Sequence, residues 1–390
     1  MYCMKYLSRT LEAKLRLISG QFPVTVVTGP RQSGKSTMLR HMFPAYHYVS
    51  FDDASVRLAA KQEPALFVSG LPVPVILDEV QYAPEILPYI KISVDSERVN
   101  GRFILTGSQV FNLMARISES LAGRAALFEL LPFSLAETGT IPVNQRDCYR
   151  QILQGFYPAP NTQETDLQTF YGSYLSTYIE RDVRQIQNVK DISTFEIFMQ
   201  ILAGRAGGLL NVQQIARDCG ISHATAVSWL SVLEITRIIY LLRPFYRNTT
   251  KRLVKSPKLY FTDTGLLAFL LKYRDAETLL AGAVSGSIFE NMLVIEALKW
   301  KYNTHSSADL YFYRDSNGVE VDLIIHDGQL FSLYEIKSGA AIRSEMASNL
   351  ASVPFEGAKR FLLSFNEHPL PMGNGVQAIP WWKVEWGASK

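Results

Sequence analysis

The chain has 390 residues, with 39 Lys and Arg against 36 Asp and Glu, a formal net charge of +3 and 47% hydrophobic residues. This length excludes a single small module, because domains usually contain about 100–200 residues. The composition excludes global disorder, since disordered chains combine few hydrophobic residues with a high net charge. A net charge of +3 favours no class of partner, so evidence for a nucleic-acid site has to come from local clusters of Lys and Arg.

No uninterrupted apolar stretch is long enough to span a membrane. The best candidate, residues 226–242, contains Glu234 and Arg237, whereas a span needs about 20 mainly apolar residues. The N-terminal sequence lacks the apolar core of a signal peptide. The three cysteines stand alone, without the spacing of zinc ligands: Cys3, Cys148 and Cys219. We therefore expect a cytoplasmic protein without a membrane segment, zinc or a disulfide framework.

Three regions differ in their sequence pattern, and together they predict a multidomain α/β protein. Residues 1–160 alternate short β-branched runs (VTVVTG, VPVILDE, RFILTGS) with helical stretches, as parallel βα units do. Residues 161–280 have mainly helical spacing. Residues 281–390 read as a helix, three strands, a helix and a strand. The DSNG and HDG turns favour an antiparallel meander of the three strands, so this region is predicted to be an α+β unit.

A glycine-rich loop follows the first apolar run. In VTVVTGPRQSGKST the spacing is G-x-x-x-x-G-K-[ST], between a predicted strand and a predicted helix. In such a loop, backbone N–H groups and the helix N-terminus bind phosphates, the lysine reaches the β- and γ-phosphates, and the serine binds Mg²⁺. A purely structural turn is the alternative. We expect ATP and Mg²⁺ to be bound here, with contacts from Gly29, Pro30, Arg31, Gln32, Ser33, Gly34, Lys35, Ser36 and Thr37.

Two acidic residues end the second apolar run, PVILDEV. Their position at the tip of a buried strand predicts that Asp78 holds Mg²⁺ and that Glu79 activates water. The tip of the third run, RFILTGSQ, carries Thr106, Ser108 and Gln109. These polar side chains are candidates for contact with the γ-phosphate or the attacking water, and ordinary loop polarity is the alternative.

Phosphoryl transfer usually needs a further cation near the transferred group. Arg124, in ESLAGRAALFEL, is our candidate, acting in trans or after domain closure. Arg31 and Arg116 are competing candidates. For each of the three, a surface salt bridge is the alternative interpretation.

The middle region contains a predicted helix-turn-helix. VQQIARDC and HATAVSWLSVLEI are joined at a turn around Gly220, and the second helix is predicted to bury Ala226, Val227, Leu230 and Leu233. Residues 243–258 carry six Lys or Arg and no acid, which resembles the wing of a winged-helix domain. We expect DNA contact, with phosphates bound by Arg247, Lys251 and Arg252 and bases read by His223 and Thr225. Protein docking by the same unit is the alternative.

The C-terminal region carries acidic residues at spacings that suit a metal site. Glu335 and Lys337 share a strand face, and an adjacent antiparallel strand can bring Asp322 beside them. Glu290 can approach from the preceding helix. Carboxylates around a divalent ion, with a lysine nearby, suit phosphodiester hydrolysis. We therefore expect Asp322 and Glu335 as metal ligands and all four residues as catalytic, with a catalytically inactive binding module as the alternative.

These motifs resemble a widespread prokaryotic family of AAA-like ATPases with a C-terminal PD-(D/E)xK-like domain of unknown function. The resemblance rests on TGPRQSGKST, VILDEVQ, FILTGSQ, FENMLVIE and GVEVDLII…LYEIKSG, and it covers nearly the whole chain. It implies a P-loop AAA-type core at 1–160, a winged-helix domain at 161–280 and a nuclease-like domain at 281–390. The sequence departs from the nuclease motif because Val321 replaces the proline expected before Asp322.

Two functions follow from this pattern. The first is a Mg²⁺-dependent ATPase whose nucleotide state controls a DNA-engaging winged helix and a nuclease-like domain, with a metal-dependent deoxyribonuclease activity left open. The second is an ATP-gated switch or scaffold that binds a protein partner or further copies of the chain, with the nuclease-like module inactive.

Overall fold

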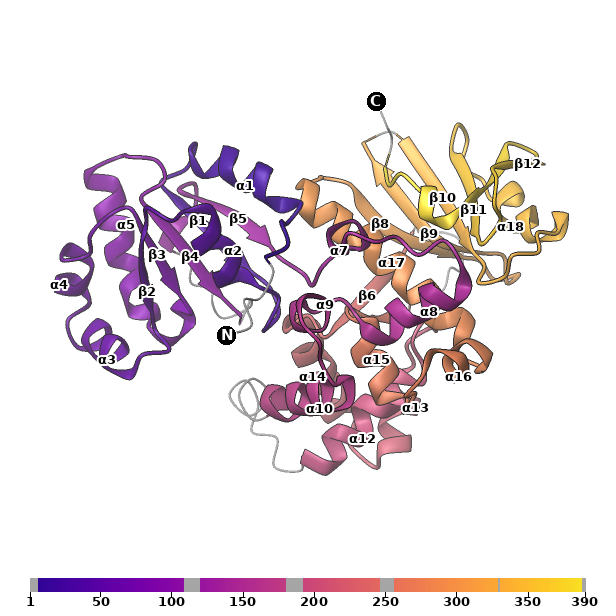
Figure 1. Ribbon diagram of the computed structural model, residues 1–390, viewed down its shortest axis with the longest axis horizontal. Coiled ribbons are helices and arrows are strands. Elements are labelled where there is room, and N and C mark those ends of the chain that lie inside the picture. The colour runs from indigo at the N-terminus through magenta and orange to yellow at the C-terminus, as the bar shows by residue number, and fades with distance from the viewer. Residues whose placement is uncertain (1–5, 109–119, 180–191, 246–255, 329, 388–390) are drawn as a thin grey trace. The chain divides into compact units, whose positions relative to one another are not determined.

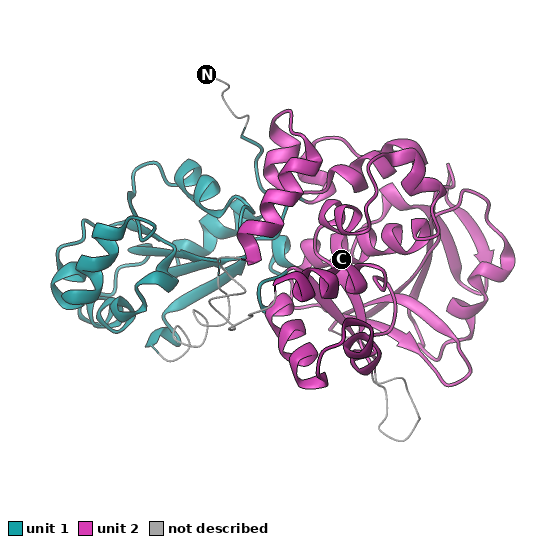
Figure 2. Ribbon diagram, turned by 90° about the horizontal axis from the view of Figure 1, so that it is seen from below, with its two compact units in different colours: residues 1–133, 235–237, 302–305 teal, residues 134–234, 238–301, 306–390 magenta. Residues whose placement is uncertain are grey.

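The computed structural model describes residues 6–108, 120–179, 192–245, 256–328 and 330–387. The chain divides into two compact units (Figure 2). Unit 1 comprises residues 1–133, 235–237 and 302–305, and unit 2 comprises the remaining residues. None of the helices in the described ranges is long and apolar enough to cross a membrane.

A parallel sheet of five strands forms the centre of unit 1 (Figure 1). Its spatial order is β2-β3-β4-β1-β5, and each neighbouring pair is parallel. The predicted parallel βα architecture of the N-terminal region is therefore confirmed. The strands are β1 (Val24–Thr28), β2 (His47–Ser50), β3 (Val75–Asp78), β4 (Phe103–Gly107) and β5 (Ala125–Glu129).

Helices cover both faces of this sheet, which explains why its inner strands are continuous apolar runs. Val26, Leu77 and Leu105 pack in the core on one face, whereas their strand neighbours Val27 and Ile76 pack on the other. Successive side chains along a strand point to opposite faces of the sheet. Both sets are buried because each face is covered. The helical elements of the unit are α1 (Leu11–Ser19), α2 (Lys35–Met42), α3 (Ala54–Gln62), α4 (Pro64–Ser69), η1 (Val80–Tyr82), η2 (Pro84–Ile86) and α5 (Leu87–Ser96).

An eight-stranded mixed sheet organises unit 2, in the order β12-β13-β11-β10-β9-β8-β6-β7. The predicted antiparallel meander is β8, β9 and β10, and β11 then pairs parallel to β10. The strands are β6 (Ile239–Pro244), β7 (Lys258–Phe261), β8 (Asp309–Arg314), β9 (Glu320–Asp327), β10 (Leu330–Ile336), β11 (Lys359–Ser364), β12 (Leu370–Gly373) and β13 (Val376–Pro380).

Helices precede, interrupt and follow the strands of unit 2 along the chain (Figure 1). They are α7 (Leu135–Thr138), α8 (Gln145–Gln154), α9 (Pro158–Thr162), α10 (Leu167–Tyr178), α12 (Ile192–Ala203), α13 (Val212–Cys219), α14 (His223–Ile235), α15 (Thr264–Leu270), α16 (Ala276–Ala281), α17 (Ser285–Thr304), η4 (Ser344–Ala347), α18 (Ser348–Ser352) and η5 (Trp381–Lys383). The last residues of α14 and α17 belong to unit 1.

The boundaries predicted at 160 and 280 do not coincide with the two units. Residue 160 lies inside α9, and unit 2 begins earlier, at Ser134. The regions 161–280 and 281–390 share one sheet, because β6 pairs parallel with β8 through Arg243 and Tyr311. The pairing of β6 with β8 therefore places strands from regions 161–280 and 281–390 in the same sheet.

Candidate functional site

The glycine-rich loop connects β1 to α2 and needs glycine at two positions. A Cβ at Gly29 would lie 2.1 Å from the carbonyl oxygen of Leu130, and Gly29 has a φ of +145°. Gly34 precedes α2 with a φ of +91°, a left-handed conformation that other residues rarely adopt. The loop backbone consequently packs tightly against the chain that follows β5.

The polar groups inside this loop suit a phosphate ligand. The ammonium of Lys35 donates hydrogen bonds to the carbonyl oxygens of Gly29 (3.0 Å) and Pro30 (2.9 Å). The Ser33 hydroxyl is buried without a hydrogen-bond partner among the described residues. Buried polar groups normally have partners, so this loop fits a nucleotide. Gln32 and Thr37 are exposed beside it.

Three hydroxyl groups converge on the carboxylate of Asp78 at the end of β3. Ser36 Oγ donates to Asp78 Oδ2 at 2.8 Å, Thr106 Oγ1 donates to Oδ1 at 2.5 Å, and Tyr48 donates to Oδ2 at 2.5 Å. The pKa of Tyr48 is raised above its usual value, mainly by burial and also by the hydrogen bond to Asp78. Carboxylate and hydroxyl oxygens are the ligands that Mg²⁺ prefers, so Ser36 and Asp78 fit the predicted metal position.

Glu79 follows Asp78 in a left-handed conformation, with a φ of 58°. Its Oε2 accepts a hydrogen bond from Ser108 Oγ at 3.3 Å and another from the amide of Gln81. Thr106 and Ser108 thus contact the two acidic residues, as their place at the tip of β4 allows. Gln109 lies outside the described residues.

Of the candidate arginines that the structure describes, Arg31 is part of the loop and Arg124 lies away from it. Arg124 precedes β5 and forms a two-pronged ion pair with Asp95, with N–O distances of 2.6 and 2.9 Å. In a parallel sheet the start of β5 lies at the edge opposite the end of β1, so Arg124 does not face the phosphate loop of its own chain. Arg31 donates to the Tyr82 hydroxyl at 2.9 Å, and Arg116 lies outside the described residues.

Arg9 is a loop contact that the sequence pattern did not indicate. Its guanidinium donates to the carbonyl oxygens of Ser33 (2.9 Å) and Leu131 (2.7 Å) and lies 4.7 Å from the centre of the Phe133 ring. Arg9 is 5% exposed. Tyr48 and Gln81 were also missed as site residues. Tyr48 contacts Asp78 from a neighbouring strand, and Gln81, although it ends the VILDEVQ motif, was given no role of its own.

A second cluster of charged residues lies in unit 2, where α17 meets strands β7, β9 and β10. The ammonium of Lys258 lies 3.0 Å from Glu290 Oε1, 2.5 Å from Glu320 Oε1 and 3.4 Å from Asp322 Oδ1. Its side chain is 3% exposed. The Tyr260 hydroxyl donates to Glu290 Oε1 at 2.6 Å. We call these residues, with Glu335 and Lys337, the acidic cluster.

The structure brings together the four residues that the sequence nominated in this region. Lys337 Nζ lies 2.6 Å from Glu335 Oε1, and the backbone N–H of Ile336 donates to Asp322 Oδ2 at 2.9 Å. Burial, with the nearby charge of Asp322, raises the pKa of Glu290 to about 7 and that of Glu335 to about 8. These shifts reflect carboxylates crowded in a site of low polarity.

Two features of the acidic cluster differ from the expected site. Lys258 was placed in the DNA-contacting stretch 243–258, but it is the first residue of β7 and its ammonium is buried among carboxylates. It is therefore not available to a phosphate backbone. In addition, the described part of the chain contains no group of three or more His, Cys, Asp or Glu side chains that could hold a metal ion.

The helix pair α13 and α14 is joined at Gly220, which has a φ of 68°. Ala226, Leu230 and Leu233 are buried as predicted, but Val227 is 43% exposed because it lies one residue off the buried face. His223 is exposed, and the Thr225 hydroxyl lies 2.8 Å from that of Ser222. Arg247, Lys251 and Arg252 lie outside the described residues.

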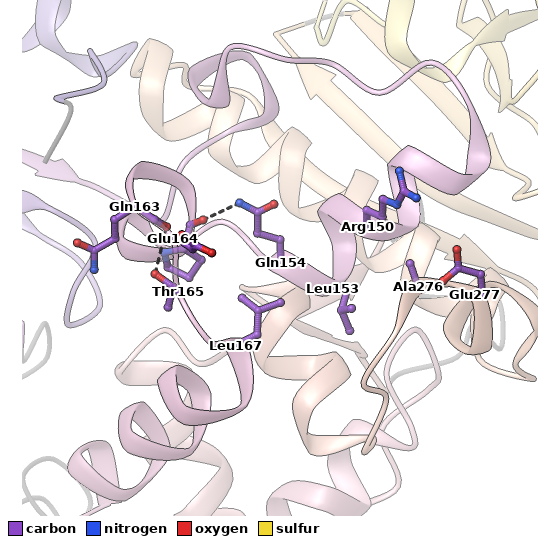
Figure 3. A pocket seen from close by; sticks show the side chains of 10 residues that line it. Arg150, Leu153, Gln154, Gln163, Glu164, Thr165, Leu167, Ala276 and Glu277 are labelled. Atoms are coloured by element: carbon purple, nitrogen blue, oxygen red, sulfur yellow. Dashed lines mark hydrogen bonds between the residues drawn. The ribbon is translucent and has the colours of Figure 1, made fainter. Parts of the chain in front are cut away.

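Unit 2 contains a hollow of about 400 Å³, and Figure 3 shows side chains that line it. Some of its polar side chains already have partners. Gln154 donates to the carbonyl oxygen of Pro160 at 2.6 Å, and Arg150 pairs with Asp147 at 3.0 Å. The hollow contains none of the predicted site residues. Its lining includes Arg150, Leu153, Gln154, Gln163, Leu167 and Glu277.

Comparison with known families matches three parts of the chain to family models. Residues 21–139 match a model described as an AAA domain. Residues 145–277 and 285–384 match two domains of unknown function, DUF8612 and DUF4143. The AAA match contains the phosphate loop together with Asp78 and Glu79, so the core of unit 1 is that of a P-loop ATPase.

Full-length relatives and solved structures complete the comparison. The uncharacterized proteins Mb2031c of Mycobacterium bovis and Rv2008c of Mycobacterium tuberculosis are each 30% identical over 382 residues, which cover 97% of this chain and 84% of theirs. A Walker-type ATPase of Pyrococcus abyssi is 17% identical, with a TM-score of 0.46 over 66% of this chain and 94% of that chain. The Thermotoga maritima RuvB branch migration motor is 15% identical, with a TM-score of 0.31 over 59% and 87%. The chain belongs to the family of these mycobacterial proteins and carries an AAA domain at its P-loop core.

Proposed function

We propose that the protein binds and hydrolyses ATP in a Mg²⁺-dependent reaction. The observation that carries this proposal is the network at the tips of β1, β3 and β4, where Lys35 and Ser36 of the loop lie beside Asp78 and Glu79. These groups are the ones a phosphoryl-transfer site needs: a cation for the phosphates, oxygen ligands for a metal and a base for water.

Each residue has a distinct part in this proposal. Lys35 leaves the loop carbonyls to bind the β- and γ-phosphates. Ser36 and Asp78 hold Mg²⁺, which neutralises charge on the phosphate oxygens. Glu79 accepts the proton of the attacking water, while Gln81 and Ser108 orient its carboxylate.

Glu79→Gln tests the hydrolytic step. The variant should bind ATP with unchanged affinity and lose turnover by about 10²–10⁴-fold, because the amide cannot accept the proton. Glu85→Gln, an exposed residue on η2, is the matched control and should keep wild-type turnover. Lys35→Ala should lose ATP affinity itself. Wild-type turnover in Glu79→Gln would remove Glu79 from the mechanism.

We further propose that the helix pair of unit 2 engages DNA under the control of this ATPase. The order of three helices, α12 to α14, and the paired strands β6 and β7 supports a winged-helix domain. His223 at the start of α14 and Arg243 on β6 are exposed. The sequence α17, β8, β9, β10, α18, β11 likewise supports a nuclease-like fold of the PD-(D/E)xK kind.

The DNA proposal predicts binding that depends strongly on salt. A protein that neutralises several phosphates releases counterions, so its affinity falls steeply between ~50 and ~200 mM salt. Fluorescence anisotropy of a labelled duplex measures this directly. Absence of salt-dependent binding, with ATP or ADP present, would favour the alternative of an ATP-gated switch that docks a protein partner.

A further inference from the structure

We infer that Lys258 is the resident cation of the acidic cluster, that its ammonium takes the place in which a nuclease-like site would hold a divalent metal, and that the cluster binds no such metal. This inference does not depend on the ATPase proposal, because it concerns only residues of unit 2. It makes the C-terminal part of the chain a binding module that does not cleave nucleic acid.

The first step is the position of Lys258. It begins β7, where it pairs with Leu242 of β6 and bridges to Leu209. The backbone is therefore fixed by strand pairing. The side chain is 3% exposed, so a long aliphatic stem and a charged head are both held in the interior. A buried ammonium persists only where carboxylates compensate it.

The second step is the match between donors and acceptors. An ammonium has three N–H donors, and Lys258 Nζ lies within 3.4 Å of three carboxylates, those of Glu290, Glu320 and Asp322. These acids come from two elements, α17 and β9. Lys258 thus joins β7, α17 and β9 through one charged centre.

The third step concerns the carboxylate oxygens of the acidic cluster that do not bind Lys258. Asp322 Oδ2 accepts from the backbone of Ile336, Glu320 Oε2 pairs with Arg314 at 3.0 Å, and Glu335 Oε1 pairs with Lys337. Of the cluster oxygens, Glu335 Oε2 is buried without a hydrogen-bond partner. Glu290 binds Lys258 and Tyr260 through Oε1, which leaves its Oε2 as a second oxygen without a partner among the described residues. Mg²⁺ requires near-octahedral oxygen coordination, so these two oxygens do not complete a site.

The fourth step is charge balance. Four carboxylates of the cluster and its rim, those of Glu290, Glu320, Asp322 and Glu335, face three cations, Lys258, Lys337 and Arg314. A divalent ion would add two positive charges next to the buried ammonium, and like charges repel strongly in a poorly solvated site. Lys337 cannot fill the same role as Lys258, since its side chain is 38% exposed at the rim.

Mn²⁺ titration of the full chain, without nucleotide, tests this inference. Electron paramagnetic resonance reports bound Mn²⁺, and thermal unfolding reports stabilisation by it. Wild type and Asp322→Asn should bind Mn²⁺ identically, because the cluster contributes no site. Mn²⁺ binding by wild type that Asp322→Asn abolishes would overturn the inference, as would Mn²⁺-dependent cleavage of duplex DNA lost in the same variant.

Lys258→Met provides the second arm, since Met keeps most of the stem and removes the charge. Its melting temperature should fall by roughly 10 °C because carboxylates are left uncompensated, and it should gain one Mn²⁺ per chain. Lys301→Met, which breaks a more exposed pair with Asp309, is the control and should change neither property. A folded Lys258→Met protein that gains no Mn²⁺ would contradict the inference. If the variant does not fold, the comparison of wild type with Asp322→Asn decides.

Discussion

Arg9 reaches the phosphate loop from the segment before α1. Its two hydrogen bonds, to the carbonyl oxygens of Ser33 and Leu131, tie the loop to the chain that follows β5. Arg9→Met should therefore weaken ATP binding roughly tenfold and lower the free energy of unfolding by about 3–6 kcal/mol, since two hydrogen bonds from a charged group contribute ~1.5–3 kcal/mol each. Equilibrium binding of a fluorescent ATP analogue measures the first effect.

Arg16→Met is the matched control for this change. Arg16 lies on α1, makes one hydrogen bond of 3.2 Å to the carbonyl oxygen of Met42 and does not touch the loop. It should keep wild-type ATP affinity. An Arg9→Met protein that binds ATP as tightly as wild type would show that the loop holds its shape without Arg9.

Those residues of the phosphate site that belong to a local sequence motif could be predicted individually. Lys35 and Ser36 were identified because the phosphate loop is contiguous in sequence. Arg9, Tyr48 and Lys258 were missed because their partners lie far away along the chain: Arg9 contacts Leu131, and Lys258 contacts Asp322. No period or spacing in a single sequence encodes such pairs.

At the scale of elements, α15 depends on a buried cap. Asp263 Oδ1 accepts from the N–H of Leu266 (2.8 Å) and the hydroxyl of Tyr171 (2.9 Å), and Oδ2 accepts from the N–H of Phe156 (2.7 Å). Asp263→Asn replaces one acceptor oxygen by an NH₂ donor. Depending on which oxygen is replaced, the backbone N–H of Phe156 or that of Leu266 loses its hydrogen-bond acceptor. The variant should lose about 1–3 kcal/mol of stability, measured by urea unfolding.

The same substitution predicts a pH dependence. Burial raises the pKa of Asp263 in the folded state above its ordinary value. A carboxyl with a raised folded pKa stabilises the protein at low pH, and this contribution is lost as the pH rises through the folded pKa. The stability advantage of wild type over Asp263→Asn should thus shrink from pH 4 upward. For Asp275→Asn, at the exposed cap of α16, the advantage of wild type should instead be constant above about pH 4 and shrink as the pH falls below it, because the pKa of Asp275 is lowered.

The basic stretch between β6 and β7 carries the prediction for DNA. Reversing Arg247, Lys251 and Arg252 to Glu should weaken binding to every duplex sequence and lower the slope of log affinity against log salt by about three, because each phosphate contact contributes ~0.9. The control reverses Lys272, Arg274 and Lys359, which are exposed elsewhere in unit 2 and give the same change in net charge. Equal losses in both variants would mean that net charge, not this stretch, determines binding.

Strongly patterned elements were predictable, and short edge elements were not. The runs VTVVTG and VPVILDE form the buried strands β1 and β3, and each was predictable because it is rich in β-branched and apolar residues. Strand β2 has four residues and a largely exposed edge position, so it offers no alternation to detect. The pairing of β6 with β8 joins distant segments into one sheet, and no local sequence pattern indicates such a pairing.

At the scale of the whole molecule, the chain itself connects the ATPase core to the helices of unit 2. Unit 1 includes residues 235–237, which end α14 and follow it, and residues 302–305, which end α17 and follow it. Arg237 donates to Glu129 Oε2 at 3.0 Å, and the neighbouring Leu130 donates from its N–H to Thr28, next to the phosphate loop. These contacts, all within unit 1, link the segment that follows α14 to β5 and to the last residue of β1.

The proposed coupling between ATP binding and DNA binding is reciprocal. If ATP changes the affinity for DNA, DNA changes the affinity for ATP by the same factor. The decisive measurement is the ATP affinity of Glu79→Gln, which holds ATP without hydrolysing it, with and without saturating duplex DNA. We predict that DNA shifts the ATP dissociation constant by at least about fivefold, within the usual range of coupling energies. Superimposable ATP titrations, with DNA demonstrably bound, would contradict the claim that nucleotide state controls DNA engagement.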